Sequence, residues 1–431
     1  LGEYGGGTVP PDQDLTQWQP YLHYLKEFYQ RRRVNVYFRN DQSVFYGAQV
    51  NFVNVGRGNL TFVRRDLVTG GRIPLVVARV YDSAGRGSAD LGAGWHISAA
   101  ERIEVQGARA RLFTESGAEI DFVLSGSEFR LARDFATDYR NLVIRPSGTL
   151  RVAMRDGFTR EYSLVGDSYR LTRVSDNHGN EARLTYAEGA LSRMENGAHF
   201  VEFTRDEQGR LLSVSDDRGR RVGYRFDAEG RLVEVTDIGG NTWRYGYTSE
   251  NRLHTALDPL FRLNFKAWYQ SDSRVRRMEL PSGRIEYQYD DAARSTTVTD
   301  RKDLISRYYQ DQEGITVRVI NPLGEETRIV LDAGRNPIEL WEGSALRHKM
   351  EYDSEHRIIL RRSSIPSGEV TAQYAYDPAT GKLARIQYSD GRAESFGYDT
   401  GGNLMAWSDS TNEVRSYEWS SSGDLTRVSR A

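Results

Sequence analysis

The chain has 431 residues, no cysteine and almost balanced charge, with 58 Lys and Arg against 60 Asp and Glu. The lack of cysteine excludes disulfides, thiolate nucleophiles and thiolate metal sites, and a net charge of −2 gives no electrostatic case for binding nucleic acid or an acidic membrane. The 16 Phe, 7 Trp, 25 Tyr and 41 Gly, with a mean hydropathy of −0.63, indicate a soluble, turn-rich and folded chain. No apolar run reaches the roughly 18 residues of a membrane helix, and no signal peptide is visible at Leu1.

Residues 1–43 are predicted to be a linker followed by one amphipathic helix. The first 13 residues are rich in Gly and Pro, as linkers are. Residues 14–33 repeat apolar side chains at helical spacing, and three arginines suit the helix C-terminus. The apolar face consists of Trp18, Leu22, Leu25 and Tyr29, and the arginines are Arg31, Arg32 and Arg33. The arginines are by default a solvated helix end; one hypothesis is that the helix plugs the opening of the β-structure that follows or docks on another chain.

Residues 44–164 are predicted to be a β-rich N-terminal region. Alternating segments such as Gln49 to Val53 and Ile73 to Val80 are typical of strands. Tyr81 then leads through a Gly-rich loop to Gly94-Trp95, and short strands separated by glycine turns fill the rest.

Residues 165–431 are predicted to contain about twelve hairpin repeats. The clearest copies begin at Tyr224, Tyr374 and Phe396, and each runs aromatic–Xaa–aromatic–Asp, a turn containing Gly, then Leu. A regular period of about 21 residues indicates a repeat architecture. The positions that align with this Asp are 187, 206, 227, 248, 270, 290, 311, 332, 353, 377, 399 and 420, with Ala, Thr, Gln and Ser at 187, 248, 270 and 420.

Each repeat predicts one β-hairpin with a defined turn. Alternate aromatics put two rings on one face of a strand, and Asp opens a tight turn that needs a residue tolerant of positive φ. Asn251 and His356 fill that position in two divergent copies. Elsewhere it is Gly: Gly189, Gly209, Gly230, Gly314, Gly334, Gly381, Gly402 and Gly423.

Two architectures fit about 24 strands made in this way. Pairs of hairpins could form the four-stranded blades of a six-bladed β-propeller. Alternatively, all hairpins continue one sheet, which at about 4.8 Å per strand would be ~115 Å wide and has to curl. Blades would normally require odd and even repeats to differ from each other, and these repeats do not alternate in that way. The sequence therefore favours an all-β, continuous, curled or spiral sheet, with the propeller as the alternative.

The repeated Tyr-Xaa-Tyr-Asp-Xaa-Xaa-Gly-Arg-Leu units resemble the YD repeats of bacterial Rhs-type proteins. The stretch from Tyr81 through a Gly-rich loop to Gly94-Trp95 is similar to the start of an Rhs core. The resemblance covers roughly residues 44–431. It implies a sheet wound into a hollow shell that encloses the toxic C-terminal domain of a polymorphic toxin. Related YD-repeat proteins act at cell surfaces in adhesion.

The chain also departs from the Rhs pattern. It stops inside a repeat at Ala431, and neither a self-cleavage site nor a toxin domain can be assigned. We therefore expect a fragment of a longer protein, or a short shell that needs a partner to close. The resemblance implies a secreted or cell-surface location and, as partners, a toxin or cargo polypeptide, the rest of the Rhs protein, and a secretion-system or surface component.

The sequence motifs predict no enzyme, no cofactor and no metal site. Dinucleotide and Walker loops, zinc-protease helices and nucleophile elbows are absent from the sequence, and its seven histidines lack metal-like spacing. Paired carboxylates are frequent, but turns two strands apart bring Asp side chains to glycosidase-like distances automatically. Their separation therefore says nothing about catalysis.

The aromatic residues are predicted to have mainly a structural role. Tyrosines in repeat phase are expected to form cross-strand ladders, whereas the off-phase Trp268, Trp341 and Trp407 are candidates for binding carbohydrate. The leading hypothesis is a non-enzymatic β-shell that encloses or presents a toxin or cargo polypeptide; the alternative is a carbohydrate-binding surface adhesin. The signature residues with a structural role are Tyr224, Asp227, Gly230, Tyr289, Asp290, Tyr376, Asp377, Gly381, Tyr398, Asp399 and Gly402.

Overall fold

A computed structural model describes residues 49–50, 52–71, 73–85, 90–99, 101–114, 119–132, 139–144, 148–154, 158–365, 368–378, 380–421 and 425–430. The predicted linker and helix of residues 1–43 lie outside the described residues. Every regular element within the described ranges is a β-strand, so the predicted all-β class is confirmed for that part of the chain. Within the same ranges, no helix is long and apolar enough to cross a membrane.

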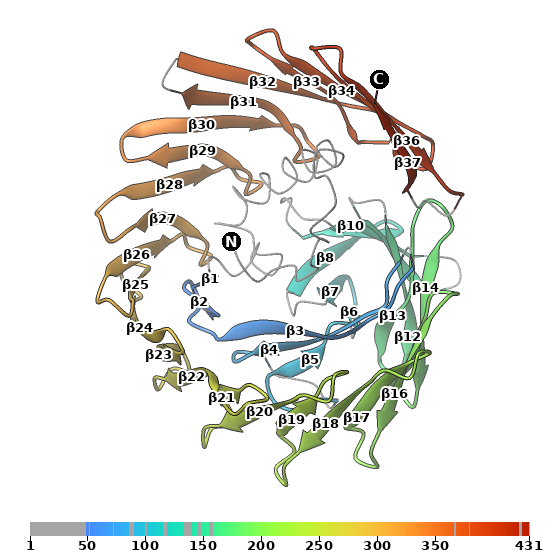
Figure 1. The fold of residues 1–431 in the computed structure, drawn as a ribbon, viewed down its shortest axis with the longest axis vertical. Coiled ribbons are helices and arrows are strands. Elements are labelled where there is room, and N and C mark those ends of the chain that lie inside the picture. Colours follow the sequence, from blue (N-terminus) through green and yellow to red (C-terminus); the bar gives the residue numbers. More distant parts are fainter. Residues whose placement is uncertain are drawn as a thin grey trace.

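Five strands precede the main sheet. They are β1 (Gln49–Val50), β2 (Val53–Asn54), β3 (Thr61–Val68), β4 (Val76–Asp82) and β5 (Trp95–Ile97). β1 pairs with β2, and β3, β4 and β5 form an antiparallel sheet in that order. Figure 1 shows this small sheet in blue, inside the curve of the main sheet.

The main sheet begins as a closed ring of strands. Its members are β6 (Arg102–Gln106), β7 (Arg109–Phe113), β8 (Glu119–Ser125), β9 (Glu128–Leu131), β10 (Tyr139–Ile144), β11 (Leu150–Met154), β12 (Thr159–Val165) and β13 (Ser168–Ser175). Consecutive strands pair antiparallel, and β13 also pairs with β6 through Tyr169 and Arg170. The second half of β13 pairs with β14, so this strand belongs both to the ring and to the sheet that continues from it.

From β14 onward, each strand pairs antiparallel with its neighbours in the sequence. The strands are β14 (Glu181–Ala187), β15 (Ala190–Glu195), β16 (Phe200–Arg205), β17 (Leu211–Asp216), β18 (Arg221–Phe226), β19 (Leu232–Thr236), β20 (Thr242–Tyr247), β21 (Leu253–Leu257), β22 (Leu263–Tyr269), β23 (Val275–Leu280), β24 (Gly283–Asp290) and β25 (Ser295–Thr299). They continue with β26 (Ile305–Gln310), β27 (Thr316–Ile320), β28 (Glu326–Leu331), β29 (Pro337–Glu342), β30 (Ala345–Tyr352), β31 (Ile358–Ile365), β32 (Gly368–Tyr376), β33 (Leu383–Tyr388), β34 (Ala393–Tyr398), β35 (Leu404–Asp409), β36 (Val414–Trp419) and β37 (Leu425–Arg430).

This succession makes one curled sheet. In Figure 1 it runs from the green strands on the right around the interior and returns, in red, to the side of β14. The predicted continuous, curled sheet is confirmed. The propeller alternative is wrong, because successive hairpins hydrogen-bond to one another instead of separating into blades.

The turn between β18 and β19 shows how the repeat signature works locally. One carboxylate oxygen of Asp227 accepts the N–H of Arg231 at 2.8 Å, and the other accepts its Nε at 2.7 Å. Gly230 has φ 76 and donates its N–H to the Asp227 carbonyl. The Asp therefore fixes both the backbone turn and the arginine that follows it.

The same left-handed position recurs in the other turns. It was predicted at Asn251 and His356, whose φ values of 60 and 58 confirm it. The prediction for Gly334 is wrong, because Arg335 takes the left-handed conformation instead, at φ 62. Arg335 is the third residue after Asp332, as Gly230 is after Asp227.

The turn carboxylates make stability depend on pH. Burial raises the pKa of Asp206, Asp216, Asp227 and Asp353, but hydrogen bonds from the turn N–H groups and from the arginine four residues on outweigh it. The pKa of each carboxyl therefore lies below its ordinary value. A depressed folded-state pKa contributes stability that is complete above the unfolded value of about 3.9 and is lost as pH falls through the folded value.

We therefore expect the urea midpoint of unfolding to hold between pH 7 and pH 5 and to drop on going to pH 3. Equal midpoints at pH 5 and pH 3 would contradict this account. The matched variant Asp227→Asn keeps the turn geometry without a titrating group, and it should show a smaller drop over the same interval.

Candidate functional site: the concave face of the sheet

The first aromatic of each repeat lies on the concave face of the sheet. In β18 and β20, Tyr224 and Tyr245 point to the small sheet inside the curve, because their hydroxyls bond to Asp66 of β3 and Arg79 of β4. Cross-strand register carries the same face along the remaining strands. Tyr308 is half-buried, and six others of these first aromatics are at most 7 % exposed: Tyr224, Tyr245, Tyr287, Tyr374, Phe396 and Tyr417.

In seven repeats the second aromatic is a tyrosine that binds the hairpin to the one before it. The hydroxyl of Tyr398 donates to the carbonyl oxygen of Leu383 at 2.8 Å, and Lys382 lies 5.7 Å from the centre of the same ring. The same hydroxyl-to-carbonyl bond is made by Tyr186, Tyr247, Tyr269, Tyr289, Tyr352 and Tyr376. The Tyr, the Arg or Lys and the Leu of the signature thus meet across neighbouring repeats.

The other signature residues lie in the turns. Asp290 accepts the N–H of Ala293 at 2.9 Å, and Asp377 accepts that of Thr380 at 2.7 Å. Asp399 accepts the N–H of Asn403 at 2.7 Å. Gly381 and Gly402 have φ 68 and 83. None of these groups faces a shared cavity, so the signature residues are spread along the sheet and form no single site.

A buried ion pair joins the small inner sheet to the concave face. Arg79 Nε and Asp66 Oδ2 are 2.7 Å apart, and their side chains are 2 % and 3 % exposed. Arg79 donates to the Tyr245 hydroxyl at 2.9 Å, and Tyr224 donates to Asp66 at 2.7 Å. Burial alone would lower the pKa of Arg79, but the Asp66 charge outweighs it and the pKa lies above its ordinary value.

An aromatic cluster lies beside this ion pair. Trp95 is fully buried, with ring centres 5.3 Å from Phe62, 5.0 Å from Tyr81 and 5.2 Å from Tyr245. Its Nε1 donates to the Tyr247 hydroxyl at 2.9 Å. The Gly94-Trp95 element noted in the sequence therefore anchors the inner sheet to strand β20.

Beyond the inner sheet, register places a largely apolar row on the concave face. Tyr308 of β26 lies opposite Val319 of β27, and later pairs continue the row to Tyr417 opposite Val428. The paired positions include Ile329 and Leu340, Tyr374 and Ile386, and Phe396 and Trp407. This face presents mainly aliphatic and aromatic side chains towards the interior.

A few polar groups interrupt this row. Glu394 is 8 % exposed, and its carboxylate accepts hydrogen bonds from Tyr388 and from Trp407, both at 3.2 Å. His348 contacts the Ser363 hydroxyl at 3.0 Å. Burial, and then the charge of Arg361, lower the pKa of His348, which keeps this imidazole neutral near pH 7. These contacts are hydrogen bonds between neighbouring strands.

The convex face carries charged pairs instead. Arg225 and Glu234, and Arg318 and Glu326, face each other across neighbouring strands. Of the candidate ligand-binding tryptophans, Trp268 and Trp341 lie on this face and Trp407 on the concave one. Each has a guanidinium over its ring, at 4.5, 5.0 and 5.6 Å respectively, from Arg277, Arg328 and Arg415.

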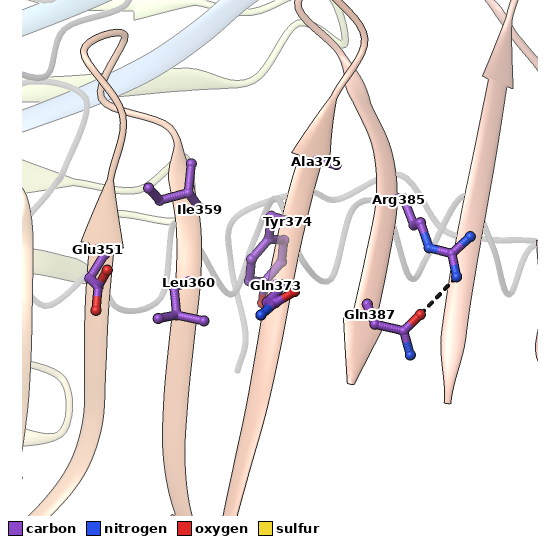
Figure 2. A pocket seen from close by; sticks show the side chains of 8 residues that line it. All are labelled: Glu351, Ile359, Leu360, Gln373, Tyr374, Ala375, Arg385 and Gln387. Carbon is purple, nitrogen blue, oxygen red and sulfur yellow. Dashed lines mark hydrogen bonds between the residues drawn. The ribbon is translucent and has the colours of Figure 1, made fainter. Parts of the chain in front are cut away.

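A shallow hollow of about 510 Å³ lies over β30–β33. Figure 2 shows its lining, in which Arg385 donates to Gln387 at 2.7 Å. Register places most of the lining on the convex face, opposite Tyr374. Its lining offers a single carboxylate, Glu351, with no second carboxylate and no histidine, serine, threonine or lysine beside it. Among the residues that the structure describes, no three His, Asp or Glu side chains are grouped to hold a metal ion.

Sequence reasoning missed the ion pair and the inner sheet. The available signal was the single charge, Arg79, within the apolar run from Ile73 to Tyr81. A lone cation at a buried position requires an anionic partner, but spacing does not reveal that the partner is Asp66.

Two family models match this chain. A domain of unknown function, DUF6531, matches residues 50–122, which span the inner sheet and the start of the ring. The RHS Repeat model matches residues 205–242 and 226–260, which lie in the curled sheet.

The chain is also similar to a curated protein and to solved structures. It is 26 % identical over 381 residues to the probable deoxyribonuclease RhsB of Dickeya dadantii (strain 3937), covering 80 % of this chain and 23 % of that protein. The TcdB2-TccC3-Cdc42 structure matches 86 % of this chain and 23 % of its own, at 12 % identity and a TM-score of 0.46. A Tc holotoxin pore of Photorhabdus luminescens matches 98 % and 29 %, at 12 % identity and a TM-score of 0.43.

The chain thus spans about a quarter of the curated relative that it matches. The predicted family rests on its own repeats, on the RHS Repeat match within them and on the Rhs-named relative. With hairpins whose Tyr, Asp, Gly, Arg and Leu interlock from one repeat to the next, this chain is an Rhs/YD-repeat protein.

Proposed function

We propose that this chain is the wall of a non-enzymatic β-shell that encloses or presents another polypeptide. One observation carries the proposal: the concave face already holds polypeptide. The inner sheet of residues 61–97 packs on β18–β22 through Trp95, the Arg79–Asp66 pair and the Tyr81 hydroxyl, which accepts the N–H of Leu253. The apolar row on β26–β37 offers the same chemistry to a second polypeptide.

The cargo is proposed to be a toxin domain or another part of a longer Rhs protein. The name of RhsB assigns a deoxyribonuclease to that protein as a whole, of which this chain matches a quarter. We propose that this chain contributes the scaffold and that a nuclease or other activity resides in the enclosed segment. A secreted or cell-surface location, with a secretion or surface partner, is part of the same proposal.

The carbohydrate-binding adhesin receives less support. A sugar stacks on an open aromatic face, whereas the three off-phase tryptophans each have a guanidinium over the ring. The first aromatics of the repeats are largely buried in the sheet, and the second ones are half-buried, as Tyr398 is, with the hydroxyl bonded to a carbonyl of the preceding hairpin. We therefore keep the shell as the proposed function.

Protease protection of a reporter tests the proposal. A flexible, epitope-tagged segment is fused after residue 431 and, separately, to an unrelated globular protein. We expect protease to cut the segment at least tenfold more slowly in the first fusion, because the concave face holds it. Equal cutting rates would refute enclosure.

Two lysine variants locate the protecting surface. Val319 lies on the concave face and Val330, half-buried like Val319, on the convex face of neighbouring strands. Val319→Lys should shorten the lifetime of the reporter, whereas Val330→Lys should leave it unchanged. The reverse result would place binding on the outside and favour an adhesin-like surface.

A further inference from the structure

Three turns share the sequence Asp-Xaa-Gly-Xaa-Asn. They are residues 237–241, 332–336 and 399–403. Their middle glycines, Gly239, Gly334 and Gly401, do not have positive φ. The backbone therefore gives no reason for glycine at this position, where other turns carry residues such as Gln208 or Glu229.

The turn at residues 332–336 shows what the glycine permits. His356, from the next hairpin turn, lies over Gly334, so that a Cβ there would be 2.5 Å from its Cε1. The Asn336 amide donates to His356 Nδ1 at 2.9 Å and to Asp332 Oδ2 at 3.0 Å. Asn336 is 4 % exposed. Asp orients the amide, glycine leaves the space and the imidazole fills it.

The turn at residues 399–403 repeats this arrangement with a distant histidine. A Cβ on Gly401 would lie 2.2 Å from Nε2 of His178. The Asn403 amide contacts that nitrogen at 2.8 Å and donates to Asp399 Oδ2 at 2.9 Å. His178 lies in the turn between β13 and β14, 225 residues earlier in the chain. This contact joins the two ends of the curl that meet in Figure 1.

The third copy provides an internal comparison. Around Gly239, the atoms within 4 Å of an added Cβ, among the residues that the structure describes, belong to Asn241 and Asp237 of the same turn. Asn241 still donates to Asp237, at 3.2 and 3.3 Å, but it is exposed. The asparagine is thus buried in the two copies in which a histidine contacts it, and exposed in the copy without one.

We propose that the Asp-Xaa-Gly-Xaa-Asn turn is a binding site for a neutral imidazole carried by another turn, and that its copy at residues 399–403 is the latch that closes the sheet on itself. An amide N–H donates, so the imidazole nitrogen facing it must be an unprotonated acceptor. The bond of the amide to Asp399 prevents it from flipping to accept instead. The latch does not depend on whether the shell holds a cargo.

The closure is therefore turn on turn. The strand pairing of β37 is with β36, and the contact across the seam is made by side chains of two hairpin turns that belong to opposite edges of the sheet. Because strands alternate in direction, the turn after β13 and the turn after β34 lie at opposite strand ends. The returning end of the sheet thus meets the beginning of the sheet edge to edge. The two ends are displaced from each other along the strand direction by about one strand length.

A distance measurement across the seam tests the latch. The chain has no cysteine, so spin labels go only to Thr185→Cys on β14 and Ala406→Cys on β35, both exposed positions. The distance between the two labels is expected to be short in this labelled protein, because the turns at residues 176–180 and 399–403 are in contact. Adding Gly401→Ala is expected to move at least half of the molecules to longer label-to-label distances. Gly334→Ala and Gly239→Ala are the matched controls, and both should keep the short distance.

A second variant covers the case in which Gly401→Ala fails to fold. His178→Ala removes the imidazole without adding an atom and should also lengthen the seam distance, with the thermal midpoint measured in parallel. An unchanged distance in His178→Ala, or in a folded Gly401→Ala, would overturn the latch. Equal lengthening in Gly334→Ala would overturn it too, because the seam would then respond to any damaged turn. The reporter assay can fail while these distances behave as expected, so the two proposals fail separately.

Discussion

Replacing Arg79 by alanine is expected to lower the free energy of unfolding by about 3–5 kcal/mol, the usual effect of breaking a buried ion pair from one side. The variant leaves Asp66, 3 % exposed, with its charge unpaired between β3 and β18. The Tyr224 hydroxyl still donates to it, but one hydrogen bond from an uncharged donor does not replace a guanidinium, which brings a positive charge and several N–H groups. The inner sheet should therefore loosen from the concave face.

Urea unfolding at pH 7 measures this effect, with Arg111→Ala as the control. Arg111 pairs with Asp121 at 2.7 Å as well, but the two side chains are 49 % and 55 % exposed. An exposed pair of this kind contributes at most ~1 kcal/mol. Similar losses for the two variants would show that the buried pair does not hold the inner sheet.

Trp95→Ala is the second substitution with a large expected effect, a loss of about 3–5 kcal/mol, as is typical when a buried aromatic becomes alanine. Trp95 is fully buried and packs on Phe62, Tyr81 and Tyr245. The cavity would open between the inner sheet and β20, where the surrounding rings cannot collapse without moving a strand.

Calorimetry or urea unfolding of Trp95→Ala, Trp95→Phe and Trp268→Ala resolves the cause. Trp95→Phe keeps most of the packing and loses the bond to Tyr247, so its effect should be smaller. Trp268 lies half-buried on the convex face, so Trp268→Ala should lower the free energy of unfolding less than Trp95→Ala or Trp95→Phe does. If Trp268→Ala destabilised the protein as much as Trp95→Ala, the inner cluster would not be the main anchor.

The repeated part of the fold could be predicted because its interactions are local. The contacts of Asp227 lie within its own turn, and the Tyr398 hydroxyl reaches a carbonyl 15 residues earlier, in the previous hairpin. A pattern with a period of about 21 residues contains these interactions in every copy. The continuous sheet follows, because no copy differs enough to end it.

The inner sheet and the seam could not be predicted, since their contacts join distant parts of the chain. Arg79 and Tyr245 are 166 residues apart, and His178 and Asn403 are 225 apart. No period relates such residues. At Gly334 the glycine was interpreted as a backbone requirement, whereas the structure shows a side-chain requirement imposed by His356. The presence of glycine in the sequence does not by itself distinguish a backbone requirement from a side-chain requirement.

Strand β13 has a consequence for how such a wall is assembled. One half of it closes the ring with β6 and the other half starts the curl with β14, so the sheet has no free edge at its origin. Because the ring side of the sheet has no unpaired strand, new hairpins can be added only at the other edge, where the last strand that has formed is still unpaired. The wall would then grow in one direction, in the order in which a ribosome delivers the repeats, and only the most recent strand would be exposed to wrong partners.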